Sequence, residues 1–355
     1  MQKIRLETKQ TYTDVIAHLQ DEASKVLNTL IPNNAHIILI DYPNNPNIGD
    51  SLIWMGEIAY LKSRNLKPSY VCDIKNYDAI AIKKIIGESS VILMHGGGNF
   101  GTVWPEEHAF RLKVLRDFPQ VKIIQFPQTI YFDNEVEIAA MRQAIADQGN
   151  FELLARSQKC YEFAKQNFSA RTYLCPDMAF FIGPIKQFNP IFDRFILART
   201  DHEKSADLMI ETSCSSLKQL TYQNSDWLEP SWQERLLHRV EMHTVFLRKI
   251  IDPNNLLLLF IWNQLSVLRL KRGVTLLSKG RVVITDRLHA HILSILMNKP
   301  HVVIDNIYGK ISNYYHSWTL NYIAATYVSD LKKLHMAAYE LDAIYGNKVL
   351  THYEK

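Results

Sequence analysis

Short apolar runs and amphipathic segments alternate along the first half of the chain, and this alternation constrains the fold more than any other feature. Five runs rich in Ile, Val and Leu have the length of buried strands, and segments with helical spacing separate them. Such alternation predicts a parallel sheet with helices on both faces, a doubly wound α/β fold. The expected strands are 36–41, 69–73, 90–95, 121–127 and 151–156, and the expected helices are 11–30, one beginning at Asp50, 78–86, 105–117, 134–148 and 157–167.

A second α/β unit follows, since 355 residues are enough for two domains of ordinary size. Its strands are expected at 194–199, 282–284 and 301–305, with helical spacing of apolar residues after Leu288. Residues 185–190 form the expected linker. The predicted domains are therefore 1–185 and 191–355, the second with a helical insertion at about 222–280.

Composition narrows the class of protein. The formal charge is +4 and no block of five or six like charges occurs, so nothing in the sequence indicates nucleic-acid binding. Cys72, Cys160, Cys175 and Cys214 show no metal-binding spacing, which predicts free thiols in a reducing compartment and no metal site.

The ends and apolar runs predict a cytoplasmic protein. The N-terminal residues are polar and lack the apolar core of a signal peptide. The longest apolar run, Leu256–Trp262, is too short to span a bilayer. Together with the basic residues at its end, however, that run suits contact with a membrane surface or a lipid-linked substrate. The alternative is an ordinary core helix.

Ligands of doubly wound sheets bind beyond the carboxyl ends of the strands. The polar groups expected there are Asp41–Asp50, His95–Gly101, Gln125–Thr129 and Arg156–Ser157. Asp50 and Ser157 are the expected caps of the helices that follow. An arginine at this edge is suited to hold a carboxylate or phosphate through two parallel hydrogen bonds. The commoner alternative is that Arg156 simply reaches solvent.

The glycine-rich stretch His95–Gly101 contains the GxGxxG spacing of dinucleotide-binding folds. The next strand, 121–127, has no acidic residue at its end, and residues 102–106 delay the following helix, so neither a nicotinamide nor a flavin cofactor is predicted. Gly97 and Gly98 instead allow backbone N–H groups to approach a ligand closely. The alternative is a tight turn.

A candidate anion site lies where strand 282–284 gives way to a helix. Asp286 is the expected N-cap, which places Arg287, Leu288 and His289 in the first helical turn. Cations are unfavourable at the positive end of a helix unless an anion lies between them and the backbone N–H groups. Lys310, beyond strand 301–305, adds a cation to the same rim. The alternative is that Arg287 pairs with a carboxylate and His289 is a hydrogen-bonded wall residue.

Several of these motifs together resemble the polysaccharide pyruvyl transferase family in order and spacing, from about residue 36 to 320. The matching motifs are Asn47–Asp50, His95–Gly101, Ala155–Ser157, Cys175–Asp177, Thr285–His289, and Asp305–Asn306 with Gly309–Lys310. The resemblance implies two Rossmann-like doubly wound domains facing a cleft, similar to GT-B glycosyltransferases.

The resemblance also implies an activity. Members of the family transfer pyruvate from phosphoenolpyruvate onto two hydroxyls of a sugar and form a cyclic ketal in a bacterial exopolysaccharide or cell-wall glycan. Carried over residue by residue, phosphoenolpyruvate is held by Arg156, Arg287, the backbone of Leu288, and His289. The expected acceptor is a sugar or lipid-linked saccharide at the inner face of the membrane, and no metal or organic cofactor is expected.

Roles for the site residues follow from the chemistry of phosphoenolpyruvate. His289 is the predicted general acid, while Arg156 and Arg287 are expected to bind the carboxylate and phosphate. Asp50, Asn99 and Asp201 are candidates for orienting the acceptor hydroxyls or acting as base. Two alternatives remain: a GT-B glycosyltransferase that uses a nucleotide sugar, and an inactive glycan-binding protein.

Overall fold

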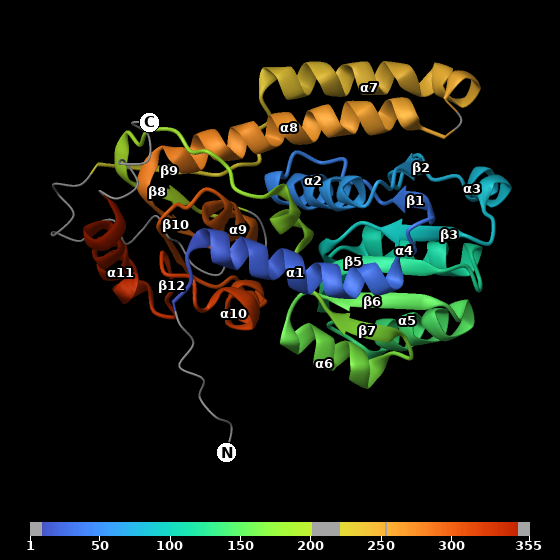
Figure 1. Cartoon of the computed structure of the whole chain (residues 1–355), viewed down its shortest axis with the longest axis horizontal. Helices are drawn as coiled ribbons and strands as arrows, with labels where there is room; N and C mark the ends of the chain where they lie inside the picture. Colours follow the sequence, from blue (N-terminus) through green and yellow to red (C-terminus); the bar gives the residue numbers. More distant parts are fainter. Residues whose placement is uncertain (1–8, 201–220, 253, 347–355) are drawn as a thin grey trace. The chain divides into compact units, whose positions relative to one another are not determined.

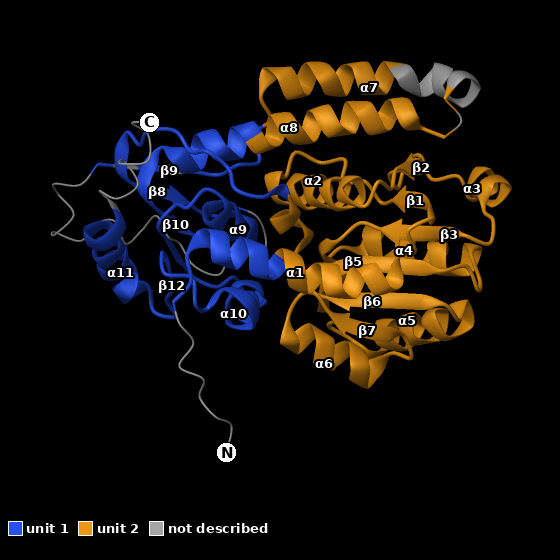
Figure 2. Ribbon diagram, in the orientation of Figure 1, with its two compact units in different colours: residues 1–19, 182–229, 271–355 blue, residues 20–181, 230–270 orange. Residues whose placement is uncertain are grey.

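The computed structural model describes residues 9–200, 221–252 and 254–346 (Figure 1). Their contacts form two compact units, shown in Figure 2. Unit 2 comprises Gln20–Phe181 and Pro230–Leu270, and the described part of unit 1 lies within Met1–Leu19, Ile182–Glu229 and Lys271–Lys355. The helical segment expected as an insertion of the second domain is thus divided, and most of it belongs to unit 2. The facing of two domains across a cleft stays a prediction.

The sheet of unit 2 has seven strands in parallel pairs, in the order β2-β1-β3-β5-β6-β7, with β4 paired to β5 (Figure 1). This confirms the predicted parallel sheet and its five strands, and adds two strands that periodicity did not indicate, β4 and β7. The bounds are β1 His36–Ile40, β2 Pro68–Cys72, β3 Ser90–Met94, β4 Gly97–Gly101, β5 Ile123–Tyr131, β6 Phe151–Ala155 and β7 Arg171–Leu174.

The stretch expected as a glycine loop or turn is strand β4. Glycine has a low strand propensity, and only the pairing with β5 makes this segment extended. Gly101 has a φ of 112°, and a Cβ there would lie 1.9 Å from the carbonyl oxygen of Tyr131. The glycine at this position is required by the close approach of two backbones.

Helices cover both faces of this sheet, as predicted for a doubly wound fold. Ile37 and Leu39 of β1 contact one core with Trp54 and Trp262, whereas alternate residues of β1 face a second core formed with the helices α3 to α6. The bounds are α1 Tyr12–Leu30, α2 Ile48–Ser63, α3 Ala79–Ile85, α4 Pro105–Asp117, α5 Glu135–Gln148, α6 Gln158–Asn167, α7 Trp232–Ile251 and α8 Leu256–Ser278.

The start of α2 corrects one expectation. Asp50 is not the cap: the helix begins at Ile48, and the side chain of Asn47 accepts the N–H of Gly49 at 3.0 Å. Asp50 lies in the first turn, where its carboxylate accepts hydrogen bonds from the amides of Asn45 and Asn47 at 3.1 and 3.2 Å. A carboxylate is favourable there because it faces the positive end of the helix dipole.

Replacing Gly56 of α2 by alanine should destabilise the protein by about 1–3 kcal/mol, the usual cost of overpacking. A Cβ at Gly56 would lie 1.8 Å from the backbone carbonyl oxygen of Met178, so the backbone has to move. Chemical denaturation of Gly56→Ala measures the loss. Gly87→Ala is the matched control, because nothing lies within 4 Å of a Cβ there, and equal stabilities of the two variants would contradict the prediction.

Unit 1 contains a second parallel sheet, of order β12-β11-β10-β8-β9. Val282 and Ile284 of its central strand pack with Ile196 against Leu334 and Ala338 of the last helix. The bounds are β8 Phe192–Leu197, β9 Tyr222–Ser225, β10 Gly280–Thr285, β11 His301–Val303, β12 Ala325–Tyr327, α9 Leu288–Leu296, α10 Lys310–Tyr314 and α11 Leu334–Leu341. Short helical turns lie at Met178–Ile182, Tyr315–Thr319, Leu331–Lys333 and Asp342–Gly346.

Two further expectations concern thiols and membrane spans. Cys72, Cys160 and Cys175 are buried free thiols, as expected, while Cys214 and Asp201 lie outside the described residues. Among the helices that the structure describes, none combines the length and the apolar character needed to cross a membrane.

Candidate functional site

The carboxyl edge of the unit 2 sheet gathers the site residues predicted in that unit. Ile40 pairs with Met94 in the register of β1 and β3, so Asp41 and His95 follow neighbouring strand ends. Arg156 follows β6, and Gly97, Gly98 and Asn99 lie on β4 beside β5. The parallel topology therefore brings these segments to one edge, as predicted.

A buried Glu57–His95 pair lies at the centre of this edge. The Glu57 carboxylate, from α2, contacts His95 Nδ1 at 2.9 Å and accepts the N–H of Gly96 at 2.8 Å. Burial disfavours the imidazolium, but the negative charges of Glu57, Asp41 and Asp50 more than offset this and raise the pKa of His95 above its ordinary value. His95 Nε2 has no hydrogen-bond partner among the described residues.

A buried arginine that the sequence analysis missed orders the glycine strand. Arg111 of α4 donates to the side chain of Gln125 at 2.7 Å and to the backbone and side-chain oxygens of Asn99 at 3.2 and 3.0 Å. Gln128 also donates to the side-chain oxygen of Asn99, at 2.9 Å. Asn99, predicted to orient an acceptor hydroxyl, is thus held through its side-chain oxygen by this network.

Asp41 is the strained member of this edge. Its φ of 71° is uncommon for a residue other than glycine, and its carboxylate is buried, with no hydrogen-bond partner for Oδ2 in the described part of the chain. Burial raises its pKa to about 7, although the charges of Arg111 and His95 act in the opposite direction. A carboxyl group that titrates near neutrality at a ligand-binding edge is a candidate proton acceptor.

Asp41→Asn should remove a pH-dependent loss of stability. The pKa of Asp41 is raised from 3.8 to about 7, so the folded state binds the proton more tightly and stability falls as pH rises through this window. Between about pH 5.5 and 8.5 the wild type should lose about 2 kcal/mol relative to the variant. Urea denaturation at both pH values measures the difference. The exposed Asp147, replaced by Asn, is the control; the same pH dependence in both variants would contradict the prediction.

Arg156 is buried and is held in place by its neighbours. Its Nε donates to Thr129 Oγ1 at 2.7 Å, and its Nη1 contacts the Asp177 carboxylate at 2.8 Å. The alternative in which Arg156 simply reaches solvent is therefore wrong: the side chain is buried at the carboxyl edge of the sheet and is already paired with a carboxylate. Ser157 caps α6 by accepting the N–H of Cys160, as the sequence indicated.

At the carboxyl end of β10, in unit 1, the expected helix cap is wrong. Asp286 accepts the backbone N–H of Arg199 at 2.9 Å instead of a helix N–H, and α9 begins at Leu288 with Arg287 in the cap position. Strand β8 pairs with β10, and this brings the backbone N–H of Arg199, just after β8, within hydrogen-bond distance of the Asp286 carboxylate. Burial raises the pKa of Asp286 to about 6, opposed by the Arg199 hydrogen bond and by the charge of Arg287.

The Arg287 guanidinium is buried against an acidic and an aromatic side chain. It contacts the two carboxylate oxygens of Asp226 at 2.6 and 2.7 Å and lies 5.8 Å from the ring centroid of Trp227. This confirms the alternative in which Arg287 pairs with a carboxylate. Direct binding of a ligand by Arg287 stays a prediction.

The other predicted site residues of unit 1 lie at the same sheet edge. Leu288 is buried and His289 is partly exposed, both in the first turn of α9. Lys310 begins α10 after β11, the strand next to β10, and its ammonium group lies 5.5 Å from the ring centroid of Tyr308. Each unit therefore has its own carboxyl edge with buried cations.

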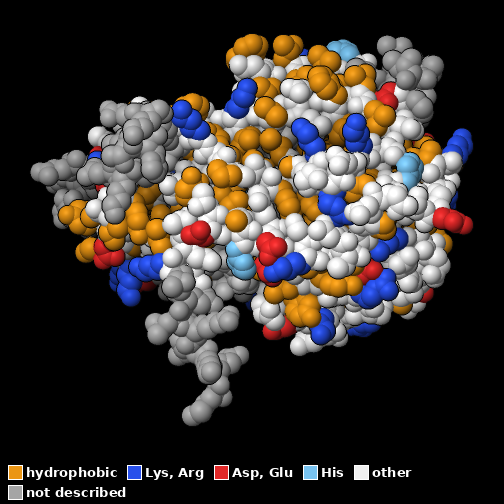
Figure 3. All heavy atoms as spheres, viewed as in Figure 1, with side chains coloured by type: hydrophobic (Ala, Val, Ile, Leu, Met, Phe, Trp, Pro, Cys, Tyr) orange, Lys and Arg blue, Asp and Glu red, His pale blue; other side chains and the backbone are white. Residues whose placement is uncertain are grey.

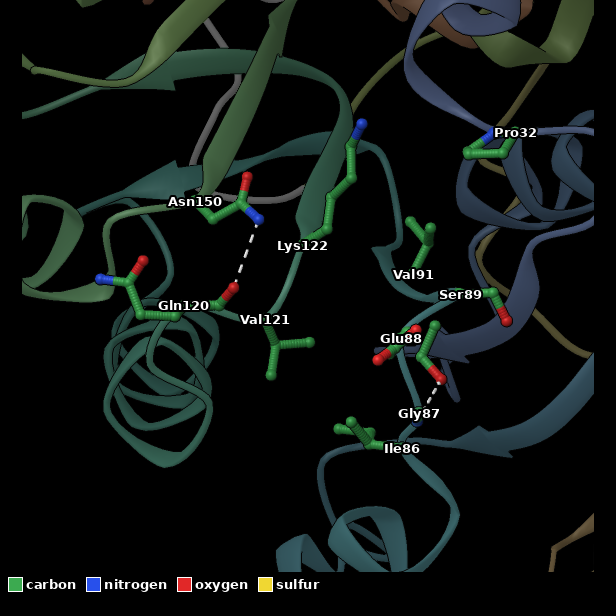
Figure 4. Close-up of a pocket in the computed structure, with 11 residues that line it drawn as sticks. Pro32, Ile86, Gly87, Glu88, Ser89, Val91, Gln120, Val121, Lys122 and Asn150 are labelled. Carbon is green, nitrogen blue, oxygen red and sulfur yellow. Dashed lines mark hydrogen bonds between the residues drawn. The ribbon is translucent and has the colours of Figure 1, made fainter.

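A surface pocket of about 370 Å³ lies elsewhere, at the amino-terminal edge of the unit 2 sheet (Figure 4). Its charged residues are Glu88 and Lys122, and its wall includes the turns that precede β3, β5 and β6. None of the predicted site residues lines it. Within the described ranges no group of three or more His, Cys, Asp and Glu side chains could hold a metal ion.

Comparison with known proteins shows to which family the chain belongs. The family model of polysaccharide pyruvyl transferases matches residues 47–308, which includes Asp50, the glycine strand, Arg156 and the Arg287–His289 turn. The chain belongs to the polysaccharide pyruvyl transferase family. The sequence resemblance is thereby confirmed, and with it pyruvyl transferase as the class of enzyme.

Individual members of this family are clearly related to the chain. Pyruvyl transferase 1 of Schizosaccharomyces pombe is 34% identical over 297 residues, covering 79% of this chain and 69% of that protein. Putative pyruvyl transferase EpsO of Bacillus subtilis is 31% identical over 291 residues, covering 81% and 87%. A functionally uncharacterised protein from Klebsiella pneumoniae has a similar fold, with a TM-score of 0.56 at 19% identity over 88% of this chain and 99% of its own.

Four residues of the two edges were missed by the sequence analysis: Glu57, Arg111, Asp226 and Asp177 as a partner of Arg156. A signal existed for two of them. Glu57 is one helical turn from the apolar Trp54 and Leu61 in α2, and Arg111 is one turn from Val114 and Leu115 in α4. A charged side chain at such a position indicates a polar partner. No periodic pattern marks Asp226, which follows a short strand in the middle of a segment of mixed composition.

Proposed function

We propose that this pyruvyl transferase takes pyruvate from phosphoenolpyruvate and forms a cyclic ketal on two hydroxyls of a sugar, during exopolysaccharide or cell-wall glycan synthesis in the cytoplasm. Membership of the family supports the transfer, and the exopolysaccharide context is suggested by the name of the EpsO relative. The acceptor is a free or lipid-linked saccharide, and the reaction uses no metal or organic cofactor.

The observation that carries the proposal is the turn Arg287–His289. It presents a buried guanidinium, the first N–H groups of a nine-residue helix and an imidazole at one strand end. Phosphoenolpyruvate carries its carboxylate and its phosphate on the same carbon atom, and such a turn can bind oxyanions through charge and through directed N–H groups. Lys310 supplies a second cation at the same edge, which helps to balance the charge of Asp226.

The reaction sets what these groups must do. A general acid protonates the methylene carbon of phosphoenolpyruvate, and the adjacent carbon becomes electron-poor. One sugar hydroxyl attacks that carbon and loses its proton to a base; the second hydroxyl then displaces phosphate, also losing a proton, and closes the ketal. We assign the acid to His289 and the binding of the donor to Arg287, the Leu288 N–H and Arg156.

The acceptor is assigned to the carboxyl edge of unit 2. Asp50, Gly97, Gly98 and Asn99 lie there, where carboxylate, amide and backbone groups suit the hydroxyls of a sugar. Because Asn99 is held through its side-chain oxygen, its amide N–H₂ is the group that is left to donate to a hydroxyl oxygen.

A thermal-shift titration tests the donor without knowledge of the acceptor. Phosphoenolpyruvate at about one hundred times its dissociation constant should stabilise the protein by about 2.7 kcal/mol. UDP-, GDP- and CMP-sugars serve as the comparison, because a GT-B glycosyltransferase would bind one of them instead. Stabilisation by a nucleotide sugar alone would replace the proposal by glycosyl transfer. Binding of phosphoenolpyruvate without turnover on any acceptor tested would favour an inactive glycan-binding protein.

A further inference from the structure

The hairpin formed by α7 and α8 exposes an unusual amount of apolar surface. Seven of the eighteen large hydrophobic side chains exposed in the described residues belong to these two helices. Figure 3 shows hydrophobic side chains along the top of the view, where Figure 1 places α7 and α8. We define the hairpin face by six of these residues: Trp232, Leu236 and Val240 of α7, and Leu256, Leu257 and Phe260 of α8.

Core packing does not account for this face. The opposite side of α8 supplies the buried contacts: Leu258, Ile261, Trp262 and Leu265 pack into the core beneath the sheet of unit 2. Trp232, Leu236 and Val240 are spaced four residues apart and form one row on the outer side of α7, with Trp232 70% exposed. The apolar side chains of this row therefore remain exposed and do not pack into the core.

The exposed charged side chains described on the two helices are basic, and Asp252, in the turn between them, is engaged in capping α8 through the N–H groups of Leu256 and Leu257. The acidic residues Glu234 and Glu241 of α7 point inward and are only 2% exposed; Glu241 contacts Trp262 Nε1 and Asn44, and Glu234 lies 3.9 Å from Arg269. Arg235 and Arg239 are exposed beside the apolar row, and α8 contains no acidic residue. A helix that buries its acids and exposes aromatic, aliphatic and basic side chains has the composition of an interfacial helix.

We propose that the α7–α8 hairpin face binds the surface of an anionic lipid bilayer. Apolar side chains enter the boundary between headgroups and acyl chains, and the arginines contact the anionic headgroups. A second copy of this chain suits the face less well, because the same face of a copy has the acids Glu234 and Glu241 buried and offers neither as a partner to the exposed arginines. None of the six residues of the hairpin face has a role in the proposed reaction, so the inference does not depend on that reaction.

Vesicle co-sedimentation of the full chain tests the proposal. The protein should bind vesicles of phosphatidylglycerol and phosphatidylcholine, bind pure phosphatidylcholine weakly, and dissociate as salt is added. The double variant Trp232→Gln/Phe260→Gln should lower the partition coefficient by about tenfold or more. Its matched control is Ile80→Gln/Val136→Gln, which removes two equally exposed apolar side chains from α3 and α5 and should bind like the wild type.

Charge and depth are tested separately. Arg235→Gln/Arg239→Gln should weaken binding to anionic vesicles by about tenfold or more, since each basic residue near such a surface contributes about 1 kcal/mol. Trp232→Phe should retain binding but lose the blue shift of fluorescence that an inserted indole gives. Equal binding by all variants, or no binding of the wild type to anionic vesicles, would overturn the proposal. So would a dimer in size-exclusion chromatography that only Trp232→Gln/Phe260→Gln abolishes, because a second copy would then cover the face.

Discussion

Arg287→Ala should abolish the thermal stabilisation by phosphoenolpyruvate and lower kcat/KM by about a thousandfold or more. The guanidinium is buried at the start of α9, where a phosphate or carboxylate would meet both its positive charge and the helix N–H groups. Loss of a directed donor to a charged group in a site shielded from water costs about two to three orders of magnitude, and loss of binding adds to this. Thermal shift and steady-state kinetics measure the two effects.

Asp226 provides the control for this prediction. Arg287→Ala also leaves a carboxylate without its guanidinium, so a loss of stability alone would not show a role in binding. Asp226→Asn breaks the same ion pair from the other side, and it should retain phosphoenolpyruvate binding or strengthen it, because the competing negative charge is gone. If Asp226→Asn and Arg287→Ala lose the ligand equally, Arg287 is a structural residue and the donor site lies elsewhere.

His289→Gln should lower kcat by about two to four orders of magnitude and leave stabilisation by phosphoenolpyruvate within twofold of the wild type in ligand concentration. Glutamine is similar in size and retains a hydrogen-bond donor, but it cannot deliver a proton to carbon. His289 is partly exposed on the first turn of α9, so the substitution should cost little stability. Release of inorganic phosphate with a saccharide acceptor measures turnover.

The matched control is His18→Gln, which changes an exposed histidine of α1. It should have the activity of the wild type. Full turnover by His289→Gln would exclude His289 as the acid, and His95, with its raised pKa, would then be the next residue to replace. Loss of ligand stabilisation in His289→Gln would show instead that the imidazole binds the donor.

The alternation of strands and helices was readable because each strand of a doubly wound sheet is buried on both faces. Runs such as Ile37–Ile40 are therefore continuously apolar, and they stand out against helices with one apolar stripe. β4 was missed for the converse reason. Its glycines carry no pattern, and it is extended only because β5 lies alongside it.

The caps show the limit of local rules. Ser157 caps its helix as predicted, its hydroxyl oxygen accepting the N–H of Cys160. Asp286 has the same local sequence signal, yet its carboxylate accepts the N–H of Arg199, which lies 87 residues away in the chain. A capping rule considers only the residues around one helix end. In the folded protein, a segment after a neighbouring strand can supply the N–H group that the capping carboxylate accepts.

The sequence by itself determined the doubly wound fold, the sheet edges that carry the polar residues, and the motifs that place the chain in its family. These follow from periodicity and from residue types at strand ends, which are local properties of the chain. Only the tertiary structure decided the partners of the site residues: Asp177 for Arg156, Asp226 for Arg287, and Glu57 for His95. Each of these pairs joins different elements, and a buried charge is stable only where folding has brought its counter-charge to it.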